Sequence, residues 1–160
     1  LCTIHRRENH GKNLLKYIES IVNLAIEHPE FKFVIIRHPN PEIKKILIRY
    51  STKQTKNLII SDPVPYSTML GLIEASQLII TDSGGLQEEA SFFLKPVIVL
   101  RNSTERVESI DINNAVCVDE LENGLGALFN KMIDLEIDES NKYIYGSGKA
   151  SSLIVDNILN

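Results

Sequence analysis

Residues 78–100, LIITDSGGLQEEASFFLKPVIVL, decide the fold of this chain. The apolar run Leu78–Thr81 is typical of a buried parallel strand, and Pro96–Leu100 predicts a second one. Between them we expect a turn at residues 82–85, whose glycines are able to take positive φ, and then a helix over Leu86–Phe93. This order predicts an anion site, because the first N–H groups of a helix are unpaired and the helix dipole favours negative charge there.

The turn supplies the first candidate binding residues. Ser83 can add a hydroxyl group, and Gly84 and Gly85 let a phosphate approach the backbone. The alternative is that Ser83 only caps the helix of a tight strand-to-helix connection. Glu88 and Glu89 follow, and they would repel a phosphate unless one of them points past it. A carboxylate in that place is able to accept both hydroxyl groups of a ribose, which makes Glu89 a candidate ribose ligand.

Composition places the chain among ordinary globular proteins. It has 160 residues, of which 43% are apolar and 24% charged, and its net charge of -4 argues against nucleic-acid binding. No apolar segment reaches the roughly 18 residues of a membrane span, and no signal peptide is visible. Cys2 and Cys117 lie in apolar runs, so we expect buried thiols and a cytoplasmic protein. The chain starts inside an expected strand without an initiator Met, which we interpret as a piece whose preceding half is missing.

The remaining pattern predicts an α/β fold. Further strands are expected at Leu1–Ile4, Phe31–Ile36, Asn57–Ile60 and Ala115–Val118. Further helices are expected over residues 14–26, from Pro41 onward, over 69–73, and at Leu121–Ile137 and Ala150–Leu159. Asn9 or Asn13 is the expected cap of the first helix. This alternation predicts a Rossmann-like parallel sheet with helices on both faces, in one domain over residues 1–160.

Polar residues cluster just after the expected strands. The clusters are His5–Asn9, Arg37–Asn40, Ser61–Tyr66, Asp82–Gly85 and Arg101–Arg106. Ligands of parallel sheets bind at the carboxyl ends of the strands, so this placement predicts a single site, although each cluster alone is also compatible with a solvated loop.

The first cluster offers an imidazole and two guanidinium groups. His5 can hydrogen-bond a diphosphate, although a lone histidine is more often structural. Arg6 and Arg7 can hold a phosphate in a bidentate way; otherwise they pair with Glu8 or face water.

The last cluster offers Arg106 as a cation for phosphate, with an ion pair to Glu105 or Glu108 as the alternative. The spacing of histidines and cysteines does not resemble a zinc set. Asp62 and Asp82 are isolated in the sequence, so no paired Mg²⁺ ligands stand out and we expect no metal.

Taken together, these residues resemble the non-hydrolysing UDP-N-acetylglucosamine 2-epimerases, over essentially the whole chain and in the C-terminal half of that family. The segments that carry the resemblance are TIHRREN (residues 3–9), HPNP (38–41), TDSGGLQEEA (81–90), KPV (95–97), TER (104–106) and YGSGKA (145–150). Several ordered segments at compatible spacing form a specific signal.

The resemblance implies the nucleotide-binding lobe of a GT-B type fold, with an active site in the cleft between two lobes. It implies interconversion of UDP-N-acetylglucosamine and UDP-N-acetylmannosamine by elimination and re-addition of UDP, without a cofactor, to supply sugars for a cell-surface polysaccharide. It also implies a homodimer of the full-length protein. By position, it places Ser83, Gly84 and Gly85 on the diphosphate and Glu89 on the ribose.

Three further positions are carried over from the resemblance. His5 falls near the diphosphate and the reacting sugar, as a catalytic candidate, and Arg106 falls in the UDP site. Arg6 and His38 are candidates for a second, regulatory UDP-N-acetylglucosamine.

The chain also departs from the family. Val64 and Met69 stand where the family usually has the polar and aromatic residues that hold uracil, so backbone groups or Tyr66 are the substitutes. Because the acid and base carboxylates of the family belong to the other lobe, we expect this chain alone not to epimerise. The alternatives are the donor-binding half of a GT-B glycosyltransferase and a non-catalytic module that binds nucleotide sugars.

Overall fold

The computed structural model describes residues 1–6, 9, 11–51, 55–118 and 124–159. Parallel strands form one sheet of six, in the spatial order β3-β2-β1-β4-β5-β6. The strands are β1 (Cys2–Thr3), β2 (Phe33–Ile36), β3 (Leu58–Ser61), β4 (Ile79–Thr81), β5 (Val97–Val99) and β6 (Ala115–Cys117). The predicted Rossmann-like sheet is therefore confirmed.

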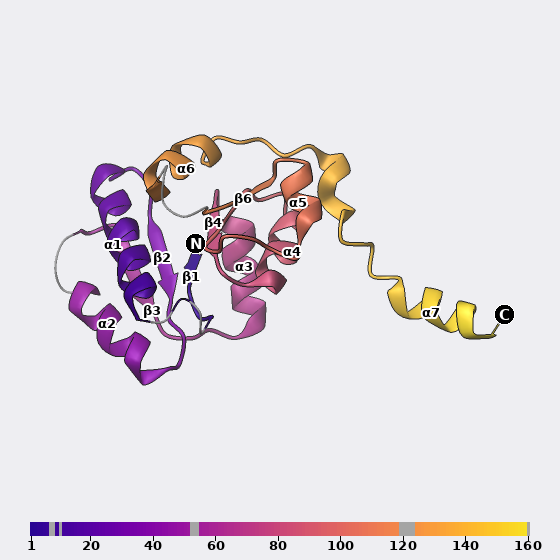
Figure 1. The fold of residues 1–160 in the computed structure, drawn as a ribbon, viewed down its shortest axis with the longest axis horizontal. Helices are drawn as coiled ribbons and strands as arrows, with labels where there is room; N and C mark the ends of the chain where they lie inside the picture. Colours follow the sequence, from indigo (N-terminus) through magenta and orange to yellow (C-terminus); the bar gives the residue numbers. More distant parts are fainter. Residues whose placement is uncertain (7–8, 10, 52–54, 119–123, 160) are drawn as a thin grey trace.

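Helices cover both faces of this sheet (Figure 1). They are α1 (Lys12–Glu27), α2 (Pro41–Ser51), α3 (Tyr66–Ala75), α4 (Gly84–Phe92), α5 (Val107–Asp111), α6 (Gly124–Met132), the 3-10 helix η2 (Glu139–Tyr143) and α7 (Ala150–Leu159). Pro41 opens α2 as expected, because its missing N–H is not needed at the first helical position. The bounds predicted for the last helix agree with α7.

The core has two layers, one on each side of the sheet. Alternation along β5 shows why: Ile98 packs with α1, α2 and α6, whereas Val97 and Val99 pack with α3 and α4. Successive strand residues point to opposite faces, so a strand that is apolar throughout fills both layers. Ile98 and Val99 are both fully buried, which accounts for the continuous apolar runs in the sequence.

Three details of the helices differ from the expectation. Neither Asn9 nor Asn13 caps α1, which instead begins after Gly11 at a positive φ of 80°. The expected polar loop after β5 contains the short helix α5. Part of the expected helix Leu121–Ile137 lies outside the described residues, and its described part ends at Met132.

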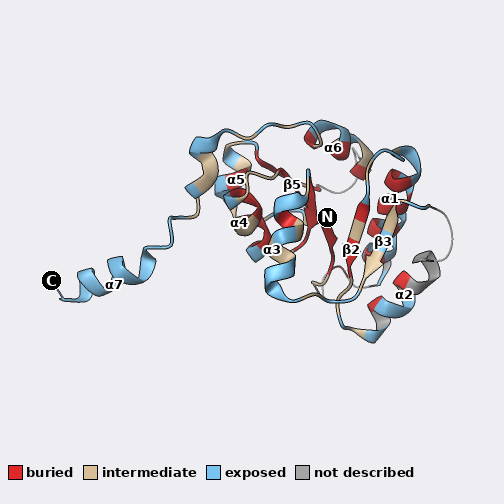
Figure 2. Cartoon of the chain, turned by 180° about the vertical axis from the view of Figure 1, so that it is seen from behind, coloured by how far each residue is buried: buried red, intermediate tan, exposed pale blue. Residues whose placement is uncertain are grey.

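Helix α7 extends away from the sheet and carries the C-terminal end of the described chain (Figure 1). All of its residues are exposed, including Leu153, Ile154 and Val155, as Figure 2 shows. Among the described residues, no helix combines the length and the apolar character needed to cross a membrane.

Candidate functional site

The strand order changes direction between β1 and β4, which are neighbours in the sheet although α1 to α3 separate them in the chain. Helix α1 after β1 and helix α4 after β4 pack on opposite faces. The two loops therefore diverge and leave room for a ligand at the carboxyl ends of these strands. Thr3 and Thr81 pair across this point, with their hydroxyl oxygens 2.6 Å apart.

Asp82 ties the two loops together. Its side chain is completely buried, and it accepts hydrogen bonds from the backbone N–H of His5 at 3.1 Å, from that of Arg6 at 2.9 Å and from Asn9 Nδ2 at 2.9 Å. The same Asn9 amide group also donates to the carbonyl of Leu100 at 3.0 Å, which adds the loop after β5. A buried carboxylate needs such donors, so this network fixes where His5 and Arg6 stand.

The glycine segment is helical, so the expectation of a turn over residues 82–85 and a helix that starts only at Leu86 is wrong for Gly84 and Gly85. Helix α4 begins at Gly84, and neither Gly84 nor Gly85 has a positive φ. Ser83 is the N-cap, with its Oγ accepting from Leu86 N at 3.4 Å. The cap expected as the alternative for Ser83 is therefore confirmed, and capping one N–H leaves others at the helix start for an anion.

Gly84 is required by close approach rather than by backbone conformation. A Cβ there would stand 3.1 Å from Glu105 Oε1 and 3.4 Å from Arg106 Cζ. The carboxylate of Glu105 thus lies over the first turn of α4, whereas a Cβ on Gly85 would meet only Ser83 Oγ, at 4.0 Å.

Three guanidinium groups surround the Glu105 carboxylate. Arg101 Nη1 donates to Oε2 at 2.7 Å, and Arg6 Nη2 donates to Oε1 at 3.4 Å. Arg106 Nη1 lies 3.2 Å from Oε1. The pKa of Glu105 falls to about 2, first because its own backbone N–H donates to the carboxylate and then because Arg101 does. The cations predicted for a phosphate therefore hold a carboxylate of the chain itself.

Arg106 has a second carboxylate partner that the sequence did not indicate. Its Nε donates to Glu88 Oε1 at 2.7 Å, so the predicted ion pair with Glu105 is found, but the pair with Glu88 is closer. Glu88 thereby points toward a cation. Glu89 turns elsewhere and accepts a hydrogen bond from Tyr66 OH at 2.8 Å. This bond is the main reason why the pKa of Tyr66 is raised.

His5 and His38 lie side by side after β1 and β2, with ring centroids 6.1 Å apart and an interplanar angle of 16°. His5 Nδ1 is 3.2 Å from Asp82 Oδ1. His38 Nδ1 accepts a hydrogen bond from the backbone N–H of Asn40, so this nitrogen carries no proton in that arrangement. The two imidazoles belong to one site, and Arg37, next to His38, pairs with Asp62.

Sequence reasoning missed several residues that build the site. Asp82, Asn9 and Glu88 were placed near the site, but their contacts were not predicted. The buried Gln87 was given no role, and it donates to the carbonyl of Ser83 at 3.2 Å and accepts from Thr104 Oγ1 at 2.8 Å. The signal that could have identified Gln87 is a polar side chain on the buried face of α4. Arg7 and Glu8 lie outside the described residues. Met69, which departs from the residue that the family uses to hold uracil, is partly buried and packs against the core.

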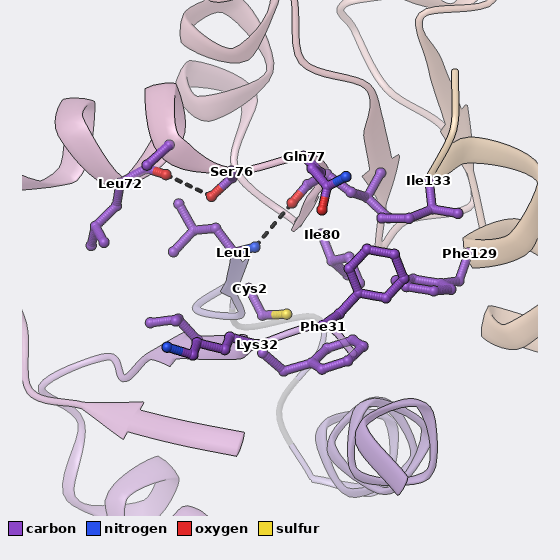
Figure 3. Close-up of a pocket in the computed structure, with 14 residues that line it drawn as sticks. Leu1, Cys2, Phe31, Lys32, Leu72, Ser76, Gln77, Ile80, Phe129 and Ile133 are labelled. Carbon is purple, nitrogen blue, oxygen red and sulfur yellow. Dashed lines mark hydrogen bonds between the residues drawn. The ribbon is translucent and has the colours of Figure 1, made fainter. Parts of the chain in front are cut away.

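Cavities lie on both ends of the sheet. A polar cavity of about 300 Å³ opens beside Asn9, Tyr17, Arg101 and Ser103, next to the candidate site. Another of about 260 Å³ lies at the amino ends of the strands (Figure 3). Cys2, Phe31 and Phe129 line it, and polar side chains do not converge there as they do at Asp82. Within the described part of the chain, His, Cys, Asp and Glu form no group of three or more suited to a metal ion.

The sheet order, the capped helix start at the switch point and the clustered arginines define a Rossmann-like domain with a candidate phosphate site. The chain belongs to the UDP-N-acetylglucosamine 2-epimerase family, whose sequence profile matches residues 1–159. A UDP-N-acetylglucosamine 2-epimerase of Neisseria meningitidis is 37% identical, over 99% of this chain and 44% of that protein. One of Campylobacter jejuni is 35% identical, over 98% of this chain and 42% of that protein.

Solved structures agree with this family. A co-structure of S. aureus MnaA with UDP matches with a TM-score of 0.85 and 30% identity, over 98% of this chain and 44% of that one. The crystal structure of the Neisseria meningitidis UDP-GlcNAc 2-epimerase bound to UDP-GlcNAc matches with a TM-score of 0.79 and 34% identity, over 99% and 43%.

A glycosyltransferase structure, at 16% identity and a TM-score of 0.61, shares the fold alone, in agreement with the expected GT-B type lobe. The chain spans less than half the length of the two epimerase relatives.

Proposed function

We propose that this chain is the UDP-binding half of a non-hydrolysing UDP-N-acetylglucosamine 2-epimerase. The observation that carries the proposal is the start of α4, where Ser83, Gly84 and Gly85 lie beside Arg6 and Arg106 in a member of this family. Backbone N–H groups and guanidinium groups at one point suit a pyrophosphate, because both stabilise concentrated negative charge.

In this proposal the phosphate ligands act on the leaving group. When the bond between sugar C1 and the diphosphate breaks, negative charge gathers on UDP, and donors already in place stabilise that charge. His5 stands at the same point, with Nδ1 beside Asp82, so Nε2 on the other side of the ring is the nitrogen that would meet the diphosphate or the sugar. Glu89 would accept the ribose hydroxyl groups, and Tyr66 OH holds its carboxylate.

The second, regulatory nucleotide sugar remains part of the proposal. Arg6 and His38 were its candidate ligands, and each contacts a residue of the UDP site: Arg6 contacts Glu105 and His38 stacks on His5. The two ligands would therefore adjoin. The catalytic carboxylates, the homodimer, the supply of sugar for a cell-surface polysaccharide and a cytoplasmic location also stay proposals, the last supported by Cys2 and Cys117 being thiols.

Calorimetric titration with UDP tests the assignment. We expect UDP to bind this chain and the Glu89→Ala variant to bind it at least about tenfold more weakly, because hydrogen bonds to a charged group are worth roughly 1.5–3 kcal/mol. Inorganic pyrophosphate should bind both proteins alike, since it has no ribose. Glu74→Ala, which removes an exposed carboxylate from α3, is the matched control and should behave as wild type.

Turnover separates the candidate functions. We expect this chain alone not to interconvert UDP-N-acetylglucosamine and UDP-N-acetylmannosamine, and a two-lobed parent protein to do so without an acceptor. ¹H NMR of the sugar anomeric signals reads this directly. A parent that only hydrolyses the donor slowly would support the glycosyltransferase alternative instead, and turnover by the chain alone would contradict the proposed division between lobes.

A further inference from the structure

The Glu105 carboxylate lies beside the first turn of α4 and is paired with the arginines there. A Cβ added to Gly84 would lie 3.1 Å from Glu105 Oε1. Three arginines contact this carboxylate: Arg6, Arg101 and Arg106. A phosphate bound by the same arginines at the same helix start would need this space. A phosphate placed in contact with Glu105 would be repelled by its carboxylate, because like charges in one site repel each other.

We propose that Glu105 is a built-in competitor for the diphosphate, which holds the arginines while the site has no ligand and leaves them when a diphosphate arrives. This inference rests on the proposed function. Glu105 is suited to the exchange because its side chain is 43% exposed and can turn into solvent. Its pKa near 2 keeps it charged at every physiological pH, so the competition is always present.

Glu88 and Glu105 hold different edges of Arg106 and therefore have different roles. Glu88 accepts from Nε at 2.7 Å, whereas Glu105 faces Nη1 at 3.2 Å. When Glu105 leaves, the Nη edge becomes available to a phosphate while Glu88 still holds the guanidinium group in place. Glu88 is thus a positioning residue for Arg106, and Glu105 is the exchangeable partner.

The consequence is a uniform reduction of affinity. Every anion that needs these arginines must first displace Glu105, so UDP and pyrophosphate lose the same factor. Weakly bound phosphates then leave the site empty, whereas a nucleotide sugar with further contacts through ribose and base still binds. Release of UDP is also easier, because Glu105 can return to the arginines as the diphosphate leaves.

The test compares two substitutions that neutralise neighbouring carboxylates. Calorimetric titrations with UDP and with pyrophosphate are run on wild type, Glu105→Gln, Glu88→Gln and the control Glu108→Gln, an exposed carboxylate of α5. We expect Glu105→Gln to bind both ligands at least threefold more tightly, Glu88→Gln to bind both more weakly, and Glu108→Gln to match wild type. Circular dichroism confirms that each variant is folded, and Glu105→Ala repeats the measurement with the side chain shortened.

The outcomes separate the two proposals. If UDP binds wild type and Glu105→Gln equally, or binds the variant more weakly, Glu105 is not a competitor, although the proposed function stands. If UDP fails to bind wild type but pyrophosphate binds Glu105→Gln more tightly than wild type, the competitor role stands and the proposed function fails. If neither ligand binds any of the proteins, both proposals are overturned.

Discussion

Both carboxylate oxygens of Asp82 accept a hydrogen bond from the single backbone N–H of His5, each at 3.1 Å. Asp82 and His5 are 77 residues apart in the chain, and the Asp82 side chain that joins them has no contact with solvent. The position of His5 in the site is therefore set from β4, and not from its own strand alone.

The Asp82→Asn substitution should destabilise the fold by about 2–3 kcal/mol, because an amide group would turn a donor toward other buried donors. Urea unfolding of the purified chain measures this free energy. Asp134→Asn, on an exposed carboxylate, should change it by less than about 0.5 kcal/mol. Equal stability of the Asp82→Asn variant and wild type would mean that this network does not hold the loops.

Tyr66 should titrate at a higher pH than an ordinary tyrosine, whose pKa is about 10, because its hydroxyl donates to the Glu89 carboxylate. A pKa raised in the folded state means that the bond stabilises below the unfolded pKa and is lost as pH rises through the folded one. NMR of the ring protons across alkaline pH measures this value. Glu89→Ala should lower it toward the ordinary value and Glu74→Ala should not. An unchanged titration in Glu89→Ala would exclude the contact.

The ion pairs of Glu105 should persist at unusually low pH. Its pKa falls from 4.5 to about 2 on folding, so its contribution to stability is present above the unfolded pKa and is lost as pH falls toward the folded one. We expect the difference in thermal midpoint between wild type and Glu105→Gln to be constant from about pH 7 to about pH 5 and to shrink below that. A difference that stays constant from about pH 5 to about pH 3 would contradict the lowered pKa.

Substitution of Ile98 should lower the stability of the fold strongly, whereas substitution of Ile154 should hardly change it. Ile98 is 0% exposed in the middle of β5, so Ile98→Ala should cost about 3 kcal/mol through lost burial and the cavity left behind. Ile154 on α7 is 59% exposed, and Ile154→Ala should change the free energy of unfolding by less than about 0.5 kcal/mol. Chemical denaturation of both variants checks the contrast. A large loss in the α7 variant would show that this helix packs on the body in solution.

The strands and helices could be predicted from the sequence wherever nearby residues determine them. The apolar runs at β4 and β5 and the proline at the start of α2 carry their own signals, and the structure agrees with them. The glycine pair misled the prediction, because glycine favours turns only when nothing else selects a helix. Here the Ser83 cap and the burial of Leu86 and Ala90 select it.

The polar contacts of the site could be predicted less well, because they join residues that are distant in the chain. Asn9 is a plausible cap by its neighbours, yet its amide donates to Asp82 and to Leu100, 73 and 91 residues away. Arg106 was weighed against adjacent carboxylates, while its shorter contact, Glu88, comes from α4. The gathering of these clusters at the carboxyl ends of the strands was predictable, but the choice of partner among them was not. The roles of Ser83, Glu89, Arg106 and His5 toward a ligand stay predictions.

Thr3 pairs with Thr81, which is 78 residues away in the chain, so the site forms only when distant segments meet. Closing a loop of that length costs more conformational entropy than a local contact, and proteins rich in such non-local pairings fold more slowly. A nascent chain leaving the ribosome has no complete site until the second half of the sheet has joined the first. A ligand that binds there recognises only the finished fold, and it stabilises the whole cooperative unit by mass action.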